Sequence, residues 1–83
     1  MKVWVCSILS CETYDNFVIG VFSDRTKAEN QANIWLQGVG ENYKETDREY
    51  ASKEYIKIYY ETILNHFLYV ATLEEFKLDS ISY

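Results

Sequence analysis

The sequence has few basic residues and no long apolar run, and both shortages exclude a class of protein. Eight Lys and Arg residues against 13 Asp and Glu leave a net charge of −5, so no basic stripe is present to release counterions from nucleic acid. The same sign disfavours docking on anionic membranes. The longest uncharged stretch, residues 62–73, is far shorter than the ~20 apolar residues that cross a bilayer. We therefore predict no nucleic-acid partner and no membrane association.

Reactive side chains are equally scarce, because Cys6, Cys11 and His66 are the only cysteines and histidine. A zinc site needs four ligands at paired spacing, so no metal site is predicted. Cys6 stands in a strand-like run where a small apolar residue is expected, without a motif that would activate it as a nucleophile. Gly38 and Gly40 suit the C-terminal cap of a helix and lack the Lys and Ser/Thr of a phosphate loop. We predict no enzyme activity and no cofactor.

Proline, internal repeats and low-complexity segments are also absent, so nothing in the sequence divides the chain. Apolar residues make up 48% of the sequence and aromatic residues 17%, enough for one core without disulfide or metal staples. The N-terminus lacks the charged, apolar and small-residue series of a secretory signal. We predict one α+β domain over residues 1–83, in the cytoplasm and with both thiols reduced.

Residues 2–10 and 17–22 predict an antiparallel hairpin. Both segments are rich in β-branched and aromatic side chains, which is typical of strands. The first segment is apolar on both faces, so we expect it in the centre of its sheet. Gly20 lies inside the second segment and indicates a bulge or a close backbone approach.

A helix is expected directly after this hairpin. Ser23 or Asp24 can cap it, and Thr26 with Glu29 forms a capping box that would start it slightly later. Ile34 lies off the apolar stripe of this helix and is expected to be exposed. The stripe itself follows helical spacing and consists of Ala28, Ala32, Trp35, Leu36 and Val39.

The segment 41–54 is polar and has few residues to anchor it. Tyr43 and Tyr50 lie seven residues apart, and the segment predicts either a short helix over residues 47–53 or a long loop. Its 14 residues exceed most structureless connections, which favours some local structure or a function.

A second hairpin is predicted for residues 55–64 and 67–78, where apolar and polar side chains alternate again. A helix from residue 64 to residue 71 is the alternative for the stretch 62–73. With the hairpin, the predicted fold is an antiparallel sheet of about four strands in the order β-β-α-β-β. One main amphipathic helix packs on one face of that sheet.

The junction between the first hairpin and the helix resembles that of a known set of proteins. Residues 19–24 are Ile-Gly-Val-Phe-Ser-Asp and are followed by Ala28 and Glu29. Small uncharacterised bacterial and phage proteins are similar: their opening β-hairpin ends in a "GVFS" type sequence and leads into an amphipathic helix. The resemblance covers the N-terminal half, and the Tyr-rich C-terminal half departs from the shorter, more charged one of that set. It implies a ββα opening and an origin in a phage or mobile element, and no catalytic residue.

Tyrosine is the residue type that suggests a function. The eight Tyr residues exceed what a core needs, because each buried hydroxyl requires a partner. Tyrosine also supplies a large contact area at low conformational entropy. Residues 41–83 hold five basic and nine acidic side chains, a charge of −4, whereas residues 1–40 hold three and four, a charge of −1. An acidic, Tyr-rich surface in the C-terminal half is therefore suited to a basic protein partner.

We accordingly predict a non-enzymatic protein-binding module, of the kind with which phage or mobile-element accessory proteins inhibit a host protein. The predicted partner-binding residues are Tyr43, Glu45, Asp47, Glu49, Tyr50, Tyr55 and Tyr59. One alternative is a protein that sequesters a small nucleotide-type ligand stacked on Tyr rings. Another is a self-assembling structural subunit. A homodimer formed through sheet edges is a companion prediction, because a small core gains from further burial.

Overall fold

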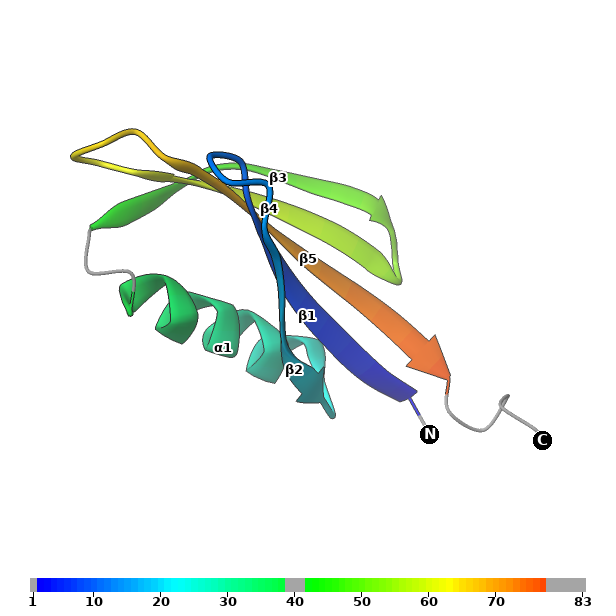
Figure 1. Ribbon diagram of the computed structural model, residues 1–83. Coiled ribbons are helices and arrows are strands. Elements are labelled where there is room, and N and C mark those ends of the chain that lie inside the picture. Colours follow the sequence, from blue (N-terminus) through cyan, green and yellow to red (C-terminus); the bar gives the residue numbers. More distant parts are fainter. Residues whose placement is uncertain (1, 39–41, 78–83) are drawn as a thin grey trace.

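A five-stranded antiparallel sheet with one helix on one face forms the protein (Figure 1). The computed structural model describes residues 2–38 and 42–77. Its elements are β1 (Lys2–Ser10), β2 (Asn16–Phe22), α1 (Arg25–Gln37), β3 (Tyr43–Ser52), β4 (Tyr55–Thr62) and β5 (Leu68–Lys77). The strand order is β2-β1-β5-β4-β3, and all neighbours are antiparallel. The predicted α+β class with one main helix is confirmed.

The first hairpin has the predicted strands and the predicted irregularity. β1 lies between β2 and β5, so its two apolar faces belong to a central strand. Cys6 pairs with Gly20 and Ser7 with Val18, which leaves Ile19 as the extra residue of a bulge. A Cβ on Gly20 would lie 2.9 Å from the Phe22 ring. Glycine at this position therefore lets the ring pack over the bulge.

The helix α1 begins at Asp24, one of the two predicted caps. The extended Asp24 accepts a hydrogen bond of 2.8 Å from a first-turn backbone N–H, as a capping side chain does. Ile34 is 56% exposed, as its place off the stripe predicted. At the other end, Gly38 donates its N–H to the Ile34 carbonyl. Val39 and Gly40, predicted for the stripe and the cap, lie outside the described residues.

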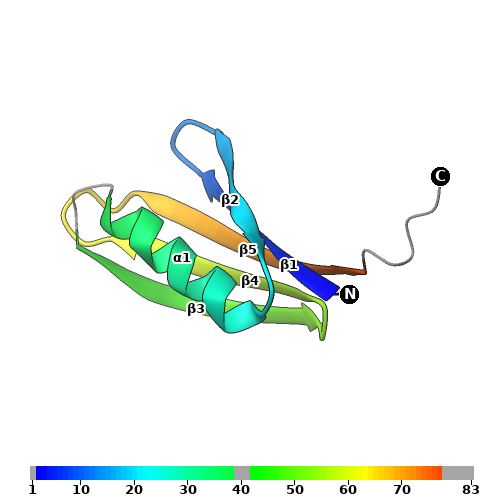
Figure 2. The ribbon, with the colours of Figure 1, turned by 90° about the horizontal axis from the view of Figure 1, so that it is seen from below.

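Figure 2 shows from below that α1 lies against one face of the sheet, and the core lies between the helix and that face. Ala28 and Ala32 are fully buried on the helix, and their small side chains allow the helix close to the sheet. Trp35 fills the space beside them, with ring centroids 5.3 Å from Phe17 and 6.0 Å from Tyr69. The strands contribute alternate residues, namely Trp4, Cys6, Ile8, Ile56, Ile58, Tyr60, Tyr69, Ala71 and Leu73.

The prediction for residues 41–54 was wrong, because the segment forms the edge strand β3 instead of a short helix or a loop. The sheet therefore has five strands rather than about four. A bulge at Thr46 explains the misleading pattern. In a regular strand, residues seven apart lie on opposite faces. The extra residue brings Tyr43 and Tyr50 to the same face, where they pair with Thr62 and Ile56 of β4. Their helix-like spacing comes from that bulge.

The second hairpin is confirmed, and the helical alternative for residues 62–73 is wrong. Thr62 and Phe67 close the turn: the Thr62 N–H donates to the Phe67 carbonyl at 2.9 Å, and the Phe67 N–H donates to the Thr62 hydroxyl at 2.9 Å. His66 takes a left-handed φ of 58° inside this turn. Leu78, the predicted end of the last strand, lies outside the described residues.

Candidate functional site

The face of the sheet that points away from α1, here called the open face, has no covering layer among the described residues. Each buried core residue in a strand alternates with a neighbour that points to this face. Val5 therefore lies on the open face between the buried Trp4 and Cys6. Its cross-strand partners Val21 and Glu74 lie beside it on that face.

One half of the open face, on β2, β1 and β5, is a mainly apolar band, in which Ser7, Thr72 and Glu74 are the polar residues on β1 and β5. Val18 is 70% exposed and Val21 is 61% exposed. Their strand, β2, consists of large apolar side chains except for Asn16 and Gly20. The band comprises Val3, Val5, Leu9, Val18, Val21, Leu68, Val70 and Phe76. Isolated exposed apolar residues need no explanation, but a contiguous apolar patch marks an interaction site.

The other half of the open face, on β3 and β4, carries the acidic and aromatic residues. Tyr59 pairs with Asp47 in the register, and Lys57 pairs with Glu49. The Tyr59 hydroxyl donates a 3.2 Å hydrogen bond to a Glu49 carboxylate oxygen. The Lys57 ammonium lies 5.8 Å from the centroid of the Tyr55 ring, a cation–π contact. Four of the seven predicted contact residues thus share this strip: Asp47, Glu49, Tyr55 and Tyr59.

The charges on this strip are mixed, because Lys44 pairs with Glu61 and Lys57 with Glu49 in the register. The pKa of Tyr59 is raised by desolvation first and then by the hydrogen bond and charge of Glu49, while Lys57 lowers it and Asp47 raises it to a smaller extent. Neither the Glu49 nor the Asp47 carboxylate forms an ion pair within the described ranges. A cation brought to this strip would therefore meet unpaired negative charge.

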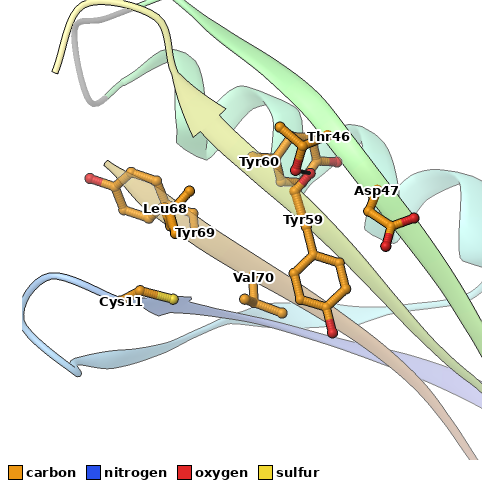
Figure 3. Close-up of a pocket in the computed structure, with 8 residues that line it drawn as sticks. All are labelled: Cys11, Thr46, Asp47, Tyr59, Tyr60, Leu68, Tyr69 and Val70. Carbon is orange, nitrogen blue, oxygen red and sulfur yellow. Dashed lines mark hydrogen bonds between the residues drawn. The ribbon is translucent and has the colours of Figure 1, made fainter. Parts of the chain in front are cut away.

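A shallow hollow of about 320 Å³ lies where the apolar band meets the acidic strip (Figure 3). Val70 and Tyr59 are cross-strand partners at its centre, with Cys11 on one side and Thr46 and Asp47 on the other. The complete lining is Cys11, Thr46, Asp47, Tyr59, Tyr60, Leu68, Tyr69 and Val70. The hollow is thus apolar along its length and acidic at the β3 end.

The other three predicted contact residues face the helix instead. Tyr43 donates its hydroxyl to the carbonyl and side-chain oxygens of Asn33, each at 3.2 Å. Glu45 binds Arg48 through two hydrogen bonds of 3.1 and 2.8 Å, and the Arg48 guanidinium also pairs with Glu29 of α1 and donates to the Tyr50 hydroxyl at 3.4 Å. These residues attach β3 to the rest of the fold. The seven predicted residues therefore do not form one surface.

Sequence reasoning missed the apolar band and the residues of the hollow on β5 and in the β1–β2 turn. A signal was present, since residues 17–22 are apolar on both faces. Such a strand is expected in the centre of a sheet, yet β2 is at the edge. An edge strand with two apolar faces and only one of them covered implies an exposed patch.

The buried cysteine and the single histidine lie in different surroundings. Cys6 is fully buried, and burial raises the pKa of its thiol to about 11, so the thiol is unreactive at neutral pH. His66 lies on the exposed β4–β5 turn, where its Nδ1 is 2.8 Å from a Glu61 carboxylate oxygen. This hydrogen bond lowers the pKa of Glu61.

Residues 2–38 and 42–77 include no group of three His, Cys, Asp or Glu side chains placed to hold a metal ion. Within the same ranges, no helix is long and apolar enough to cross a membrane.

Comparison of the chain with protein-family models, curated proteins and solved structures gave no match. The function must therefore be argued from the geometry of the open face and from the chemistry of its residues.

Proposed function

We propose that the protein is a non-enzymatic binding module that docks a basic protein partner on its open face. The observation that carries this proposal is the apolar band, which α1 leaves uncovered beside a strip of unpaired carboxylates. Interfaces combine an apolar centre with aromatic anchors and polar groups at the rim. Tyr55 and Tyr59 are the anchors, and Asp47 and Glu49 attract the partner's cations.

The open face is somewhat smaller than one side of a standard interface. Strands about 4.8 Å apart with a rise of about 3.3 Å per residue make five strands of eight residues roughly 24 Å by 26 Å, or roughly 600 Å². Stable interfaces bury about 800 Å² on each partner. The whole open face, including both the apolar band and the acidic strip, is therefore needed. The phage-type resemblance of the N-terminal half supports the narrower proposal that the partner is a host protein that the module inhibits.

The test is capture of partners from the native host by three purified baits. Val21→Lys places a cation in the apolar band, and Ile34→Lys makes the matched change on the exposed side of α1, where the side chain is 56% exposed. Protein captured by the wild type should fall at least about tenfold with Val21→Lys, since a buried unpaired charge costs more than about 1.4 kcal/mol. Capture by Ile34→Lys should match the wild type. Equal capture by both variants would contradict the proposal.

A second copy of the chain is an alternative partner, favoured by a difference between the two sheet edges. The edge strand β3 carries five charged residues, Lys44, Glu45, Asp47, Arg48 and Glu49, which is how natural sheets block pairing. The edge strand β2 carries none. Two copies paired through β2 would join their apolar bands. Sedimentation at increasing concentration should then show a dimer that Val18→Pro abolishes; a monomer at all concentrations excludes this alternative.

A further inference from the structure

We propose that the hollow on the open face receives an arginine side chain of the partner, with the guanidinium at Asp47 and the aliphatic stem over Val70. This inference rests on the proposed function and specifies its central contact. The hollow measures about 320 Å³, at the lower end of the ~300–1,000 Å³ typical of pockets for whole ligands. It is therefore suited to a single long side chain.

Charge supplies the first argument for the occupant. The Asp47 carboxylate accepts the backbone N–H of Arg48 at 2.8 Å, and it has no ion pair within residues 2–38 and 42–77. The Arg48 side chain extends to the other face, where Glu29 and Glu45 bind it. One acceptor-rich carboxylate thus remains at the end of the hollow with its charge uncompensated.

The shape of the hollow favours arginine over lysine. A guanidinium is planar, stacks on aromatic rings and forks onto carboxylates. Tyr59 is paired with both Val70 and Asp47 in the register, and it lines the hollow with them. The stem of arginine is apolar and matches the apolar side of the hollow. Leu68 and Cys11 extend that side further. An apolar residue next to the arginine would contact these two side chains.

The same charges disfavour a nucleotide in the hollow. A phosphate needs cationic or backbone N–H donors, whereas no Lys or Arg belongs to the lining. The two open-face lysines that flank the Asp47–Tyr59 pair in the register have other neighbours: Lys44 pairs with Glu61, and Lys57 lies over the Tyr55 ring. The chemistry of the hollow therefore points to a cationic side chain and away from the nucleotide-type ligand considered from the sequence.

The test is an NMR titration of the ¹⁵N-labelled protein with the dipeptide acetyl-Leu-Arg-amide. Saturable shifts are expected at the amides of Asp47, Tyr59 and Val70. The isosteric citrulline peptide lacks the charge and should bind about fivefold more weakly, the upper range for an exposed ion pair. The affinity of the corresponding lysine peptide should lie between the affinities of the arginine and citrulline peptides. Shifts elsewhere, or equal binding of the arginine and citrulline peptides, would overturn the proposal.

Two variants assign the effect to the carboxylate. Asp47→Asn keeps the oxygen that accepts the Arg48 N–H and removes only the charge, so it should weaken the arginine peptide about fivefold. Glu54→Gln removes the same charge at the β3–β4 turn and should leave the affinity unchanged. If both variants weaken binding equally, the effect is one of net charge, and the proposed site is wrong.

Capture experiments separate this inference from the proposed function. If Val21→Lys abolishes capture while Asp47→Asn has no effect, the open face binds a partner and the arginine site is wrong. If neither substitution changes capture, the proposed function itself fails. If both reduce capture and Glu54→Gln does not, both proposals are supported.

Discussion

The covered and open faces of the sheet both carry tyrosine and carboxylate side chains, but these groups have different partners on the two faces. On the covered face, Tyr43 binds Asn33, and Arg48 joins the carboxylates of Glu29 and Glu45. On the open face, the carboxylate of Asp47 has no cationic partner among the described residues. Folding accounts for the polar groups of the first face and leaves those of the second available for binding.

The largest expected effect contrasts one leucine on each side of the sheet. Leu36 is 1% exposed in the core and Leu68 is 45% exposed on the open face. Leu36→Ala should lower the free energy of unfolding by about 2–5 kcal/mol, because it removes buried methyl groups and leaves a cavity. Leu68→Ala should lower it by less than about 1 kcal/mol. Urea unfolding measures both values, and a similar loss for the two variants would mean that Leu68 is buried in solution.

A second effect concerns the buried thiol of Cys6 and its pH dependence. Burial raises the pKa of this thiol from 9.0 to about 11, so between these values the folded state keeps a proton that the unfolded state loses. The contribution of the Cys6 thiol to the free energy of unfolding is therefore fully present below pH 9 and is lost as the pH rises through about 11. The loss should be about 2–3 kcal/mol.

Cys6→Ala isolates that contribution, because tyrosines also ionise in this range. Unfolding measured from pH 8.5 to 11.5 should show a smaller decline for Cys6→Ala than for the wild type. Cys11→Ala retains the buried thiol and should decline like the wild type. Parallel curves for Cys6→Ala and the wild type would contradict the assigned burial.

A third effect tests the ionic attachment of β3 to α1. Arg48→Met keeps the volume but leaves Glu29 and Glu45 without their shared cation. We expect a loss of about 1–2 kcal/mol, between the values for surface and buried ion pairs, because the Arg48 side chain is 24% exposed. Lys57→Met, on the open face, should change stability by less than about 0.5 kcal/mol. If Arg48→Met and Lys57→Met changed the free energy of urea unfolding equally, the ion pairs of Arg48 would contribute no more stability than exposed surface pairs.

Much of this arrangement could be predicted from the sequence. The β-branched and aromatic content of residues 2–10 and 17–22 predicted two strands, and a capping residue at Ser23 or Asp24 predicted a helix, because these signals are local. The strand β3 could not be predicted, because both of its faces are polar and the bulge at Thr46 disrupts its alternation. Its stability as a strand depends on pairing with β4 and on contacts with α1, which are distant in the sequence.

The candidate site was only partly predictable for the same reason. Asp47 and Glu49 lie on one face, but Glu45 lies on the other because Thr46 is inserted between them. No residue type indicates such a bulge in advance. The apolar band required knowledge of the strand order, since only the order places β2 at an edge and brings Val21 beside Val5.

The smallest expected effect on stability comes from replacing one tyrosine by phenylalanine on each face of the sheet. Tyr43→Phe removes a hydroxyl that binds two oxygens of Asn33 in a half-buried position, so it should destabilise the fold by about 1 kcal/mol. Tyr59→Phe removes a hydroxyl that binds only the exposed Glu49, so its effect on unfolding should be no more than a few tenths of a kcal/mol.

Partner capture should reverse that order. The hydroxyl of Tyr59 holds the Glu49 carboxylate beside the hollow, whereas the Tyr43 ring packs at 5.6 Å from Tyr60 on the covered side. Tyr59→Phe should therefore weaken capture while the fold remains stable, and Tyr43→Phe should weaken the fold while capture by the folded fraction remains. If stability and capture fell together in both variants, binding would depend only on the amount of folded protein, and the functional distinction between the two faces would be wrong.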